Sequence, residues 1–167
     1  GSILVGKALA WGNEIHVLTR RKATLREEGK MQGFYWKPAV KEIDLDCFNG
    51  VDAVVHLAGA SISQPWTKKN KEAISSSRIN GTRLLVDGIR QCNGKHQIKQ
   101  VVGASAIGIY PSSFKDVYTE DYTPKRTSLL EEVVIDWEQE EDGFTSLGLN
   151  LAKLRIGLVL TKTGGVL

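Results

Sequence analysis

The residues of this chain that could contact a ligand come directly after predicted strands. The segment 51–60, VDAVVHLAGA, is an apolar run that ends in the small-residue turn Ala58-Gly59-Ala60. A strand that is apolar at nearly every position is typical of a parallel sheet covered on both faces, whose ligands lie beyond the carboxyl ends of its strands. The nearly bare turn lets a flat ligand group approach the backbone closely. The alternative interpretation is a buried strand with a tight turn and no ligand.

A basic run follows a second predicted strand. Thr19 and Arg20 end this strand, and Arg21 and Lys22 come next. In a dinucleotide-binding fold this position reads the adenosine ribose. An acidic residue there accepts hydrogen bonds from a free 2′-hydroxyl, whereas an arginine accommodates a 2′-phosphate. The run therefore favours NADP over NAD, and the alternative is a solvated basic turn, the commoner meaning of such a run.

The isolated histidine and the cysteines indicate no metal site. His56 has no second histidine near it in sequence, so we interpret it as a hydrogen-bonded core residue rather than a ligand or a base. Cys47 and Cys92 lack metal-ligand spacing and do not form a disulfide framework. Two free thiols fit a reducing cytoplasm, where we expect the protein to be located.

Composition excludes several classes of protein. The chain has 167 residues, of which 41% are hydrophobic and 25% charged, and this is typical of a globular domain. Its net charge of +3 comes from 22 basic and 19 acidic residues without a clustered basic face, so a nucleic-acid partner is not expected. No apolar run approaches the roughly 20 residues that span a bilayer, so no membrane partner is expected either. A small-molecule substrate is the remaining expectation.

Predicted strands and helices alternate along the chain. The apolar spacing predicts helices over 3–11, 67–92 and 128–142, and strands over 14–19, 33–36, 53–57, 100–104 and within 149–160. The charged segment 22–30 is predicted as a helix or a loop. This alternation predicts an α/β fold with a doubly wound, Rossmann-like parallel sheet and right-handed crossovers.

Several motifs occur in the order typical of one known family. They are Val5 to Leu9, Gly12 to Arg20, Gly50 to Ala60, Ser76-Ser77-Arg78, Ser105 to Tyr110, Thr119-Glu120-Asp121, Trp137-Glu138 and the segment 154–167. Together they resemble the extended short-chain dehydrogenase/reductase superfamily, also called the NAD-dependent epimerase/dehydratase family. Within it, the chain is most similar to the YfcH-like branch of nucleoside-diphosphate-sugar epimerases, whose substrate is not assigned.

The resemblance implies a role for residues on several elements. Gly6 takes the place of the last glycine of the family's phosphate-binding loop, and the turn Leu57, Ala58 and Gly59 packs beside the adenosine part of the cofactor. Arg78 points toward the cofactor, with a plain surface arginine as the alternative. Ser105 and Tyr110 lie over the nicotinamide as candidate catalytic residues.

The usual catalytic pair of the family is absent from its expected place. In active members a Tyr-x-x-x-Lys pair transfers the proton, but Leu129 and Val133 occupy those positions here. The sequence thus predicts an NADP-binding epimerase or oxidoreductase with an unknown substrate, which could be a nucleotide sugar. The alternative is a non-catalytic NADP-binding module, regulatory or structural, that acts through a protein partner. A homodimer is also compatible with the resemblance.

The chain lacks two parts that the family possesses. These are the first strand with its glycine-rich loop and the smaller C-terminal substrate domain, so residues 1–167 are predicted to be an incomplete NAD(P)-binding Rossmann-type domain. The first helix is also short by about one turn, because a whole crossover needs at least ~10 residues. A sheet without its central strand leaves N–H and C=O groups unpaired at a cost of about 1 to 3 kcal/mol each. We therefore expect residues to be missing at Ser2–Ile3 or at Ala10–Trp11.

Overall fold

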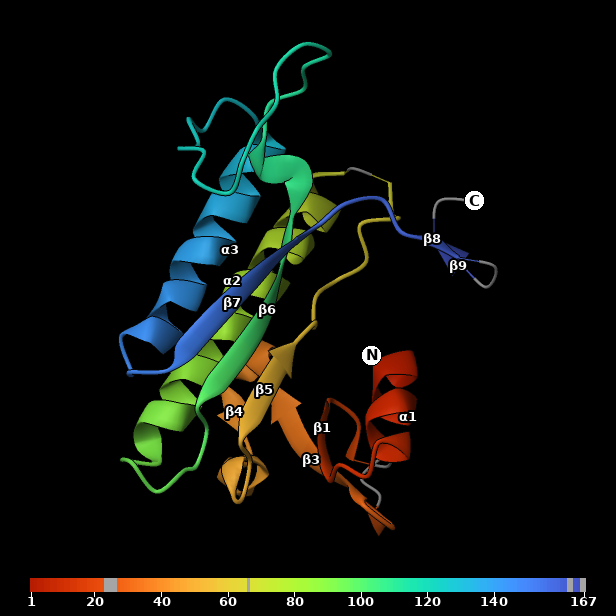
Figure 1. The fold of residues 1–167 in the computed structure, drawn as a ribbon, viewed down its shortest axis with the longest axis vertical. Helices are drawn as coiled ribbons and strands as arrows, with labels where there is room; N and C mark the ends of the chain where they lie inside the picture. The colour runs from red at the N-terminus through yellow and green to blue at the C-terminus, as the bar shows by residue number, and fades with distance from the viewer. Residues whose placement is uncertain (23–26, 66, 162–163, 166–167) are drawn as a thin grey trace.

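Alternating strands and helices form an α/β fold in the computed structural model, which describes residues 1–22, 27–65, 67–161 and 164–165 (Figure 1). The helices are α1 (Ser2–Ala10), α2 (Lys68–Gln91) and α3 (Leu129–Thr145), with short 3-10 turns at Pro38–Val40, Leu45–Phe48 and Ile107–Ile109. The strands are β1 (Ile15–Thr19), β2 (Glu27–Glu28), β3 (Met31–Lys37), β4 (Glu42–Ile43), β5 (Ala53–His56), β6 (Gln100–Ala106), β7 (Asn150–Ile156), β8 (Leu160–Thr161) and β9 (Gly164–Gly165).

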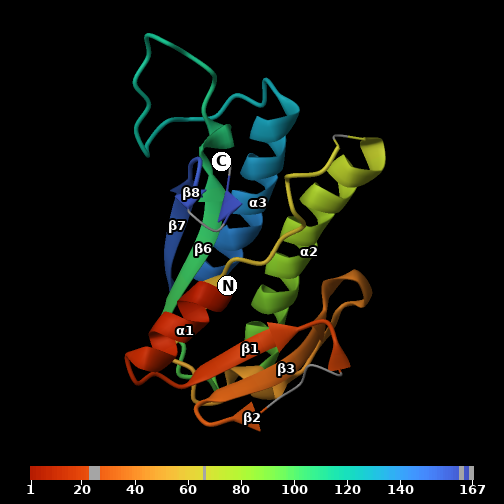
Figure 2. The ribbon, with the colours of Figure 1, turned by 90° about the vertical axis from the view of Figure 1, so that its right-hand side faces the viewer.

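The parallel strands belong to two separate sheets. β5, β6 and β7 form one parallel sheet in this order, and β1 pairs in parallel with β3 in the other. Figure 2 shows α2 and α3 on one side of the first sheet and α1 on the opposite side, beside β1. Helices on both sides of parallel strands define the doubly wound architecture that the alternation predicts.

The main core lies between the two sheets and α2. Val101 of β6, Leu85 and Ile89 of α2, and Phe144 of α3 are almost fully buried in it. α2 has its N-cap at Thr67, whose side chain accepts a hydrogen bond from the Asn70 N–H. Buried positions of α2 recur at helical spacing, so one face of this helix holds the two sheets together.

Most predicted elements are confirmed, and the differences occur at their ends. β6 extends through Ser105 to Ala106 because β7 pairs with it along its whole length, as far as Ile156. α3 begins one residue later than predicted, since Ser128 is its N-cap, and it continues to Thr145. In the charged segment 22–30, residues 23–26 lie outside the described residues, and Glu27–Glu28 form β2, which pairs with β3.

The first helix shows no interruption. The N–H of Val5 donates to the carbonyl of Gly1 at 3.0 Å, and the N–H of Trp11 donates to the carbonyl of Lys7 at 3.0 Å. The helix therefore runs continuously through both positions at which we expected missing residues.

An acidic side chain is buried where α3 packs on the sheet. The Glu141 carboxyl lies so close to Gly103 of β6 that a Cβ at this glycine would overlap it. Glu141 is fully buried, and neither of its carboxyl oxygens has a hydrogen-bond partner among the described residues. Burial raises the pKa of this carboxyl to about 8, although Lys153 partly offsets the shift. The side chain is therefore protonated at neutral pH.

This burial predicts a pH-dependent stability. The pKa of Glu141 is higher in the folded than in the unfolded chain, so the folded state binds more protons between about pH 4.3 and pH 8. The contribution of Glu141 to the free energy of unfolding should be largest below about pH 4.3 and should be lost as the pH rises to about 8. Urea unfolding across pH 5 to 9 should show this decrease, and Glu141→Gln should remove it. Glu140→Gln is the matched control, because Glu140 is partly exposed and pairs with Arg83. An identical pH dependence in both variants would contradict the assignment.

Candidate functional site

A cavity of about 810 Å³ lies between the two sheets. It is lined by β1, by β5 with the turn that follows it, and by the first turns of α1. Leu57 and Ala58 line it together with Gly1, the N-cap residue of α1, and Leu18 of β1. The cavity thus brings together the predicted small-residue turn, the start of a helix and the residue before Thr19.

The basic run lies at the carboxyl end of β1. The Thr19 hydroxyl accepts a hydrogen bond from the Arg21 N–H at 3.3 Å, which fixes the turn after the strand. Arg20 is exposed. The Lys22 ammonium lies 4.9 Å from the centre of the Tyr35 ring on the neighbouring β3. Three successive cationic residues therefore follow the carboxyl end of β1, where an anionic group could be bound.

Arg78 fastens the turn after β5 to α2. Its Nη1 donates to the carbonyl of Ala60 at 3.1 Å and to the carbonyl of Ile74 at 3.0 Å. The guanidinium lies against Gly59, where a Cβ would come within 3.1 Å of Cζ, and over the Trp137 ring at 5.0 Å. Burial lowers the pKa of this guanidinium. Arg78 therefore contacts the predicted cofactor turn, and its observed bonds go to the backbone.

Ser105 belongs to a buried polar network. It is 3% exposed, and its hydroxyl donates to Glu138 Oε1 on α3 at 2.5 Å. The same carboxylate receives two bonds from Arg155 of β7, from Nε at 3.0 Å and from Nη2 at 3.1 Å. Burial alone would raise the pKa of Glu138, but the bonds from Arg155 and Ser105 lower it below its usual value. A two-pronged charged pair of this kind orients both side chains.

Tyr110 joins the network at its other end. Arg155 Nη1 donates to the Tyr110 hydroxyl at 2.8 Å and to the carbonyl of Glu120 at 2.9 Å. The Tyr110 ring stacks on Tyr118 with a centroid distance of 5.7 Å, and Tyr122 contacts both rings. Arg155 therefore connects the end of β6 with the long loop 111–128.

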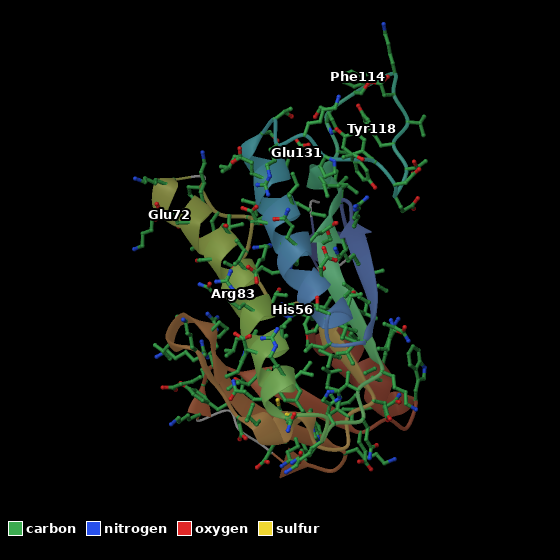
Figure 3. All side chains as sticks on the ribbon, turned by 90° about the vertical axis from the view of Figure 1, so that its left-hand side faces the viewer. His56, Glu72, Arg83, Phe114, Tyr118 and Glu131 are labelled. Carbon is green, nitrogen blue, oxygen red and sulfur yellow. The ribbon has the colours of Figure 1, made fainter. Side chains whose placement is uncertain are left out.

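Glu131 holds the far end of that loop. Its carboxylate accepts bonds from the N–H groups of Lys125 and Thr127 and from the Thr127 hydroxyl, at 2.6 to 2.7 Å. These bonds, the Thr127 side chain first, lower the pKa of Glu131 to about 2. Figure 3 shows Glu131 and Tyr118 at the same end of the molecule. The loop is therefore anchored to α3 at one end and to Tyr110 at the other.

Two predicted residues are placed differently from the others. Gly6 lies inside α1, exposed, and a Cβ there would meet nothing within 4 Å. His56 is buried, as predicted, beside Trp36 and Gly81, but its Nε2 has no hydrogen-bond partner among the described residues. The prediction that His56 is hydrogen-bonded is therefore wrong for this nitrogen, and burial lowers the pKa of the imidazole to about 4, so the ring is neutral. Within the described ranges, no group of three acidic, histidine or cysteine side chains could hold a metal ion.

The structure brings the sequence-predicted residues together in two groups. Leu57 and Ala58 line the cavity, and Gly59 follows them in the chain. Thr19 and Arg20 follow Leu18, which also lines the cavity. Ser105 and Tyr110 meet through Glu138 and Arg155, which lie in two of the family motifs but were given no role in the sequence analysis. Charged residues at alternate positions of the last predicted strand, Lys153 and Arg155, were the available signal. Leu129 and Val133 line a groove between α2 and α3, rather than this network.

The fold and these groups define a Rossmann-type domain of the dinucleotide-binding kind. The chain belongs to the NAD dependent epimerase/dehydratase family, which it matches over residues 1–129. It is 34% identical over its full length to an epimerase family protein of Staphylococcus saprophyticus, covering 54% of that protein. It is 32% identical to epimerase family protein YfhF of Bacillus subtilis over 99% of its length, again covering 54% of the relative. The chain therefore spans about half the length of these relatives.

Solved structures share the fold. The nucleoside-diphosphate sugar epimerase of Corynebacterium glutamicum is 28% identical, with a TM-score of 0.72 over 93% of this chain and 31% of that one. Human epimerase family protein SDR39U1, solved with NADPH, is 21% identical, with a TM-score of 0.73 over 99% of this chain and 52% of that one. Among the described residues, none of the helices has the length and apolar character needed to cross a bilayer.

The buried Glu138–Arg155 pair predicts that one substitution strongly lowers the free energy of unfolding. Arg155→Met leaves the Glu138 carboxylate without its main partner, and removing one member of a buried ion pair costs about 3 kcal/mol or more. We expect urea unfolding at pH 7 to show that the free energy of unfolding falls by about this amount. Arg90→Met is the control, because the Arg90–Asp87 pair is exposed and should contribute less than about 1 kcal/mol. Equal losses in the two variants would contradict the role of the network.

Proposed function

We propose that this chain is the NADP-binding part of an epimerase or oxidoreductase that acts on a small-molecule substrate, with nucleotide sugars as the first class to test. The observation that carries the proposal is the arrangement at one edge of the parallel strands. The exposed Arg20 follows β1, the Ala58–Gly59 turn follows β5, and the cavity between these strands is lined by the first turn of α1. A helix start and a nearly bare turn suit a pyrophosphate and an adenosine ribose.

The proposed cofactor site is built from residues of several elements. Thr19, Arg20, Leu57, Ala58, Gly59, Arg78 and Gly6 are the proposed cofactor residues, with Arg78 supporting the turn through the Ala60 carbonyl. The cofactor would accept a hydride as NADP⁺ or supply one as NADPH. NADP is preferred over NAD because a guanidinium at Arg20 pairs well with a 2′-phosphate. A cytoplasmic location and a homodimer stay predictions.

The proposed chemistry depends on Tyr110. Arg155 donates to its hydroxyl oxygen, which leaves the hydroxyl proton free to be donated to a substrate oxygen. Ser105 is deeply buried and bonded to Glu138, so we propose that it positions the network instead of touching substrate. The second candidate is a non-catalytic NADP-binding module that acts through a protein partner, and the absence of a Tyr–Lys pair at Leu129 and Val133 favours it.

Cofactor preference tests the first part of the proposal. The intact protein should bind NADPH more tightly than NADH in calorimetric titrations, and Arg20→Ala should remove most of the difference. A charge-assisted hydrogen bond contributes about 1.5 to 3 kcal/mol, which corresponds to roughly a ten- to hundredfold change in affinity. Lys41→Ala, which removes a cation from the turn before β4, should leave the ratio unchanged. Equal affinities of the wild type for the two cofactors would contradict the proposal.

Single-turnover oxidation of bound NADPH tests the second part. With a panel of carbonyl compounds and nucleotide sugars, we expect slow hydride transfer that Tyr110→Phe reduces by about 10²- to 10⁴-fold, the usual contribution of a positioned proton donor. Tyr118→Phe keeps the stacked ring and should retain the rate. Tight NADPH binding without oxidation by any substrate of the panel would favour the non-catalytic module.

A further inference from the structure

The hydroxyl of Tyr110 faces a fixed positive charge. Arg155 Nη1 donates to this hydroxyl at 2.8 Å, and the guanidinium carbon lies 5.3 Å from the centre of the Tyr110 ring. A tyrosine that gives up its proton keeps a negative charge on the same oxygen. A donor that is already aimed at the atom where charge develops stabilises this charge without further rearrangement. The Arg155 guanidinium is therefore placed to act when Tyr110 becomes a phenolate.

Glu138 fixes the direction of this donor. Its carboxylate accepts from Arg155 Nε at 3.0 Å and from Nη2 at 3.1 Å, and the same carboxylate accepts from the Ser105 hydroxyl. Ser105 and Arg155 are partners in the β6–β7 ladder, so the two strands set the position of both groups. The forked bond leaves Nη1 for Tyr110 and for the Glu120 carbonyl. The bond to Glu138 also raises the pKa of Arg155, so the guanidinium stays charged.

The pair joins two residues that no sequence spacing relates. Tyr110 follows the short turn after β6, whereas Arg155 belongs to β7, 45 residues later. A Tyr-x-x-x-Lys search examines a single helix, and Leu129 and Val133 at those positions line the groove between α2 and α3. Tyr110 is only partly buried, so a substrate can reach its hydroxyl. A neighbouring strand therefore supplies the cation beside the candidate proton donor.

We propose that Arg155 is the positioning residue of the proposed reaction, and that it stabilises the negative charge which Tyr110 acquires on proton transfer. This inference rests on the proposed function. As a substrate carbonyl carbon accepts a hydride from NADPH, its oxygen takes the Tyr110 proton and becomes a hydroxyl. The Tyr110 O–H bond breaks, its electron pair stays on the phenolate oxygen, and Arg155 Nη1 donates to that oxygen. A proton from water then restores the Tyr110 hydroxyl.

A coloured phenol tests the charge stabilisation without cofactor or substrate. Tyr110→Gly removes the ring and leaves space for 4-nitrophenol, whose nitro group takes the place of the tyrosine Cβ and whose phenolate alone is yellow. For the bound probe, the ratio of phenolate to phenol should exceed the ratio in free solution by roughly ten- to hundredfold, the usual effect of a charge-assisted hydrogen bond. Adding Arg155→Ala to this variant should remove the excess of phenolate.

Tyr118 provides a matched control from the same aromatic cluster. Its ring stacks on Tyr110, but its hydroxyl donates to the Asp116 carboxylate at 3.4 Å, so its oxygen faces a negative charge. The probe bound to Tyr118→Gly should therefore show no excess of phenolate. An equal excess in the two variants, or an excess that persists in Tyr110→Gly with Arg155→Ala, would overturn the role of Arg155.

Chemical rescue tests the same role in the reaction. Arg155→Ala should slow single-turnover oxidation of NADPH by about 10²- to 10³-fold, as the loss of one preorganised donor does, and should leave the Kd of NADPH unchanged. Guanidinium chloride, at concentrations that do not unfold the variant, should restore part of the rate, whereas potassium chloride should not. The salt should restore nothing when Tyr110→Phe is added, because the proton donor is then absent. Arg90→Ala removes an exposed guanidinium and is the control, whose rate should match the wild type.

The two measurements separate this inference from the proposed function. An excess of phenolate in Tyr110→Gly, with NADPH that no substrate of the panel oxidises, would support the charged pair and count against the proposed function. Oxidation at the wild-type rate in Arg155→Ala, or a slow rate without recovery in guanidinium, would overturn the inference and leave the proposed function in place. If one of these two variants does not fold by circular dichroism, the measurement on the other decides.

Discussion

Pairing of β6 with β5 on one side and β7 on the other is the interaction on which the rest of the described structure depends. Val101 and Ser105 of this strand point toward the helices, where they are almost fully buried, and Gly103 between them leaves room for the Glu141 carboxyl. The register of the two parallel ladders fixes how β5 and β7 are positioned along β6. The turn after β5 and the arginine on β7 are thereby held at the same end of the sheet, where ligands of parallel sheets are bound.

Buried polar groups around β6 have a different structural role from the apolar core side chains. Core side chains such as Phe144 and Leu85 hold the layers together without selecting one arrangement of the loops. The Glu138–Arg155 pair is directional, because its forked guanidinium bonds to the carboxylate, to the Tyr110 hydroxyl and to a loop carbonyl. Glu131 completes the fixation of the loop from α3. The candidate catalytic tyrosine is thus placed by charged groups, which tolerate little displacement.

The cavity between β1 and β5 connects the fold with the proposed function. A parallel sheet of the dinucleotide-binding type carries its ligand across neighbouring strands, and here the strands that carry Arg20 and Gly59 lie on opposite sides of the cavity. Arg78 and the Thr19 hydroxyl fix each turn locally. The relation between the two turns depends on the distance and orientation of β1 and β5 across this cavity.

The sequence by itself determined the succession of strands and helices, because period-two and period-3.6 apolar patterns and caps such as Thr67 and Ser128 are local properties. It also indicated the Rossmann-type class. Tertiary structure decided which side chains meet. Ser105 is inside β6 rather than at its end because β7 pairs with it to Ala106, and its hydroxyl consequently faces Glu138. The surroundings of Arg155, Glu141 and His56 depend on contacts between residues far apart in the chain, which no local pattern contains.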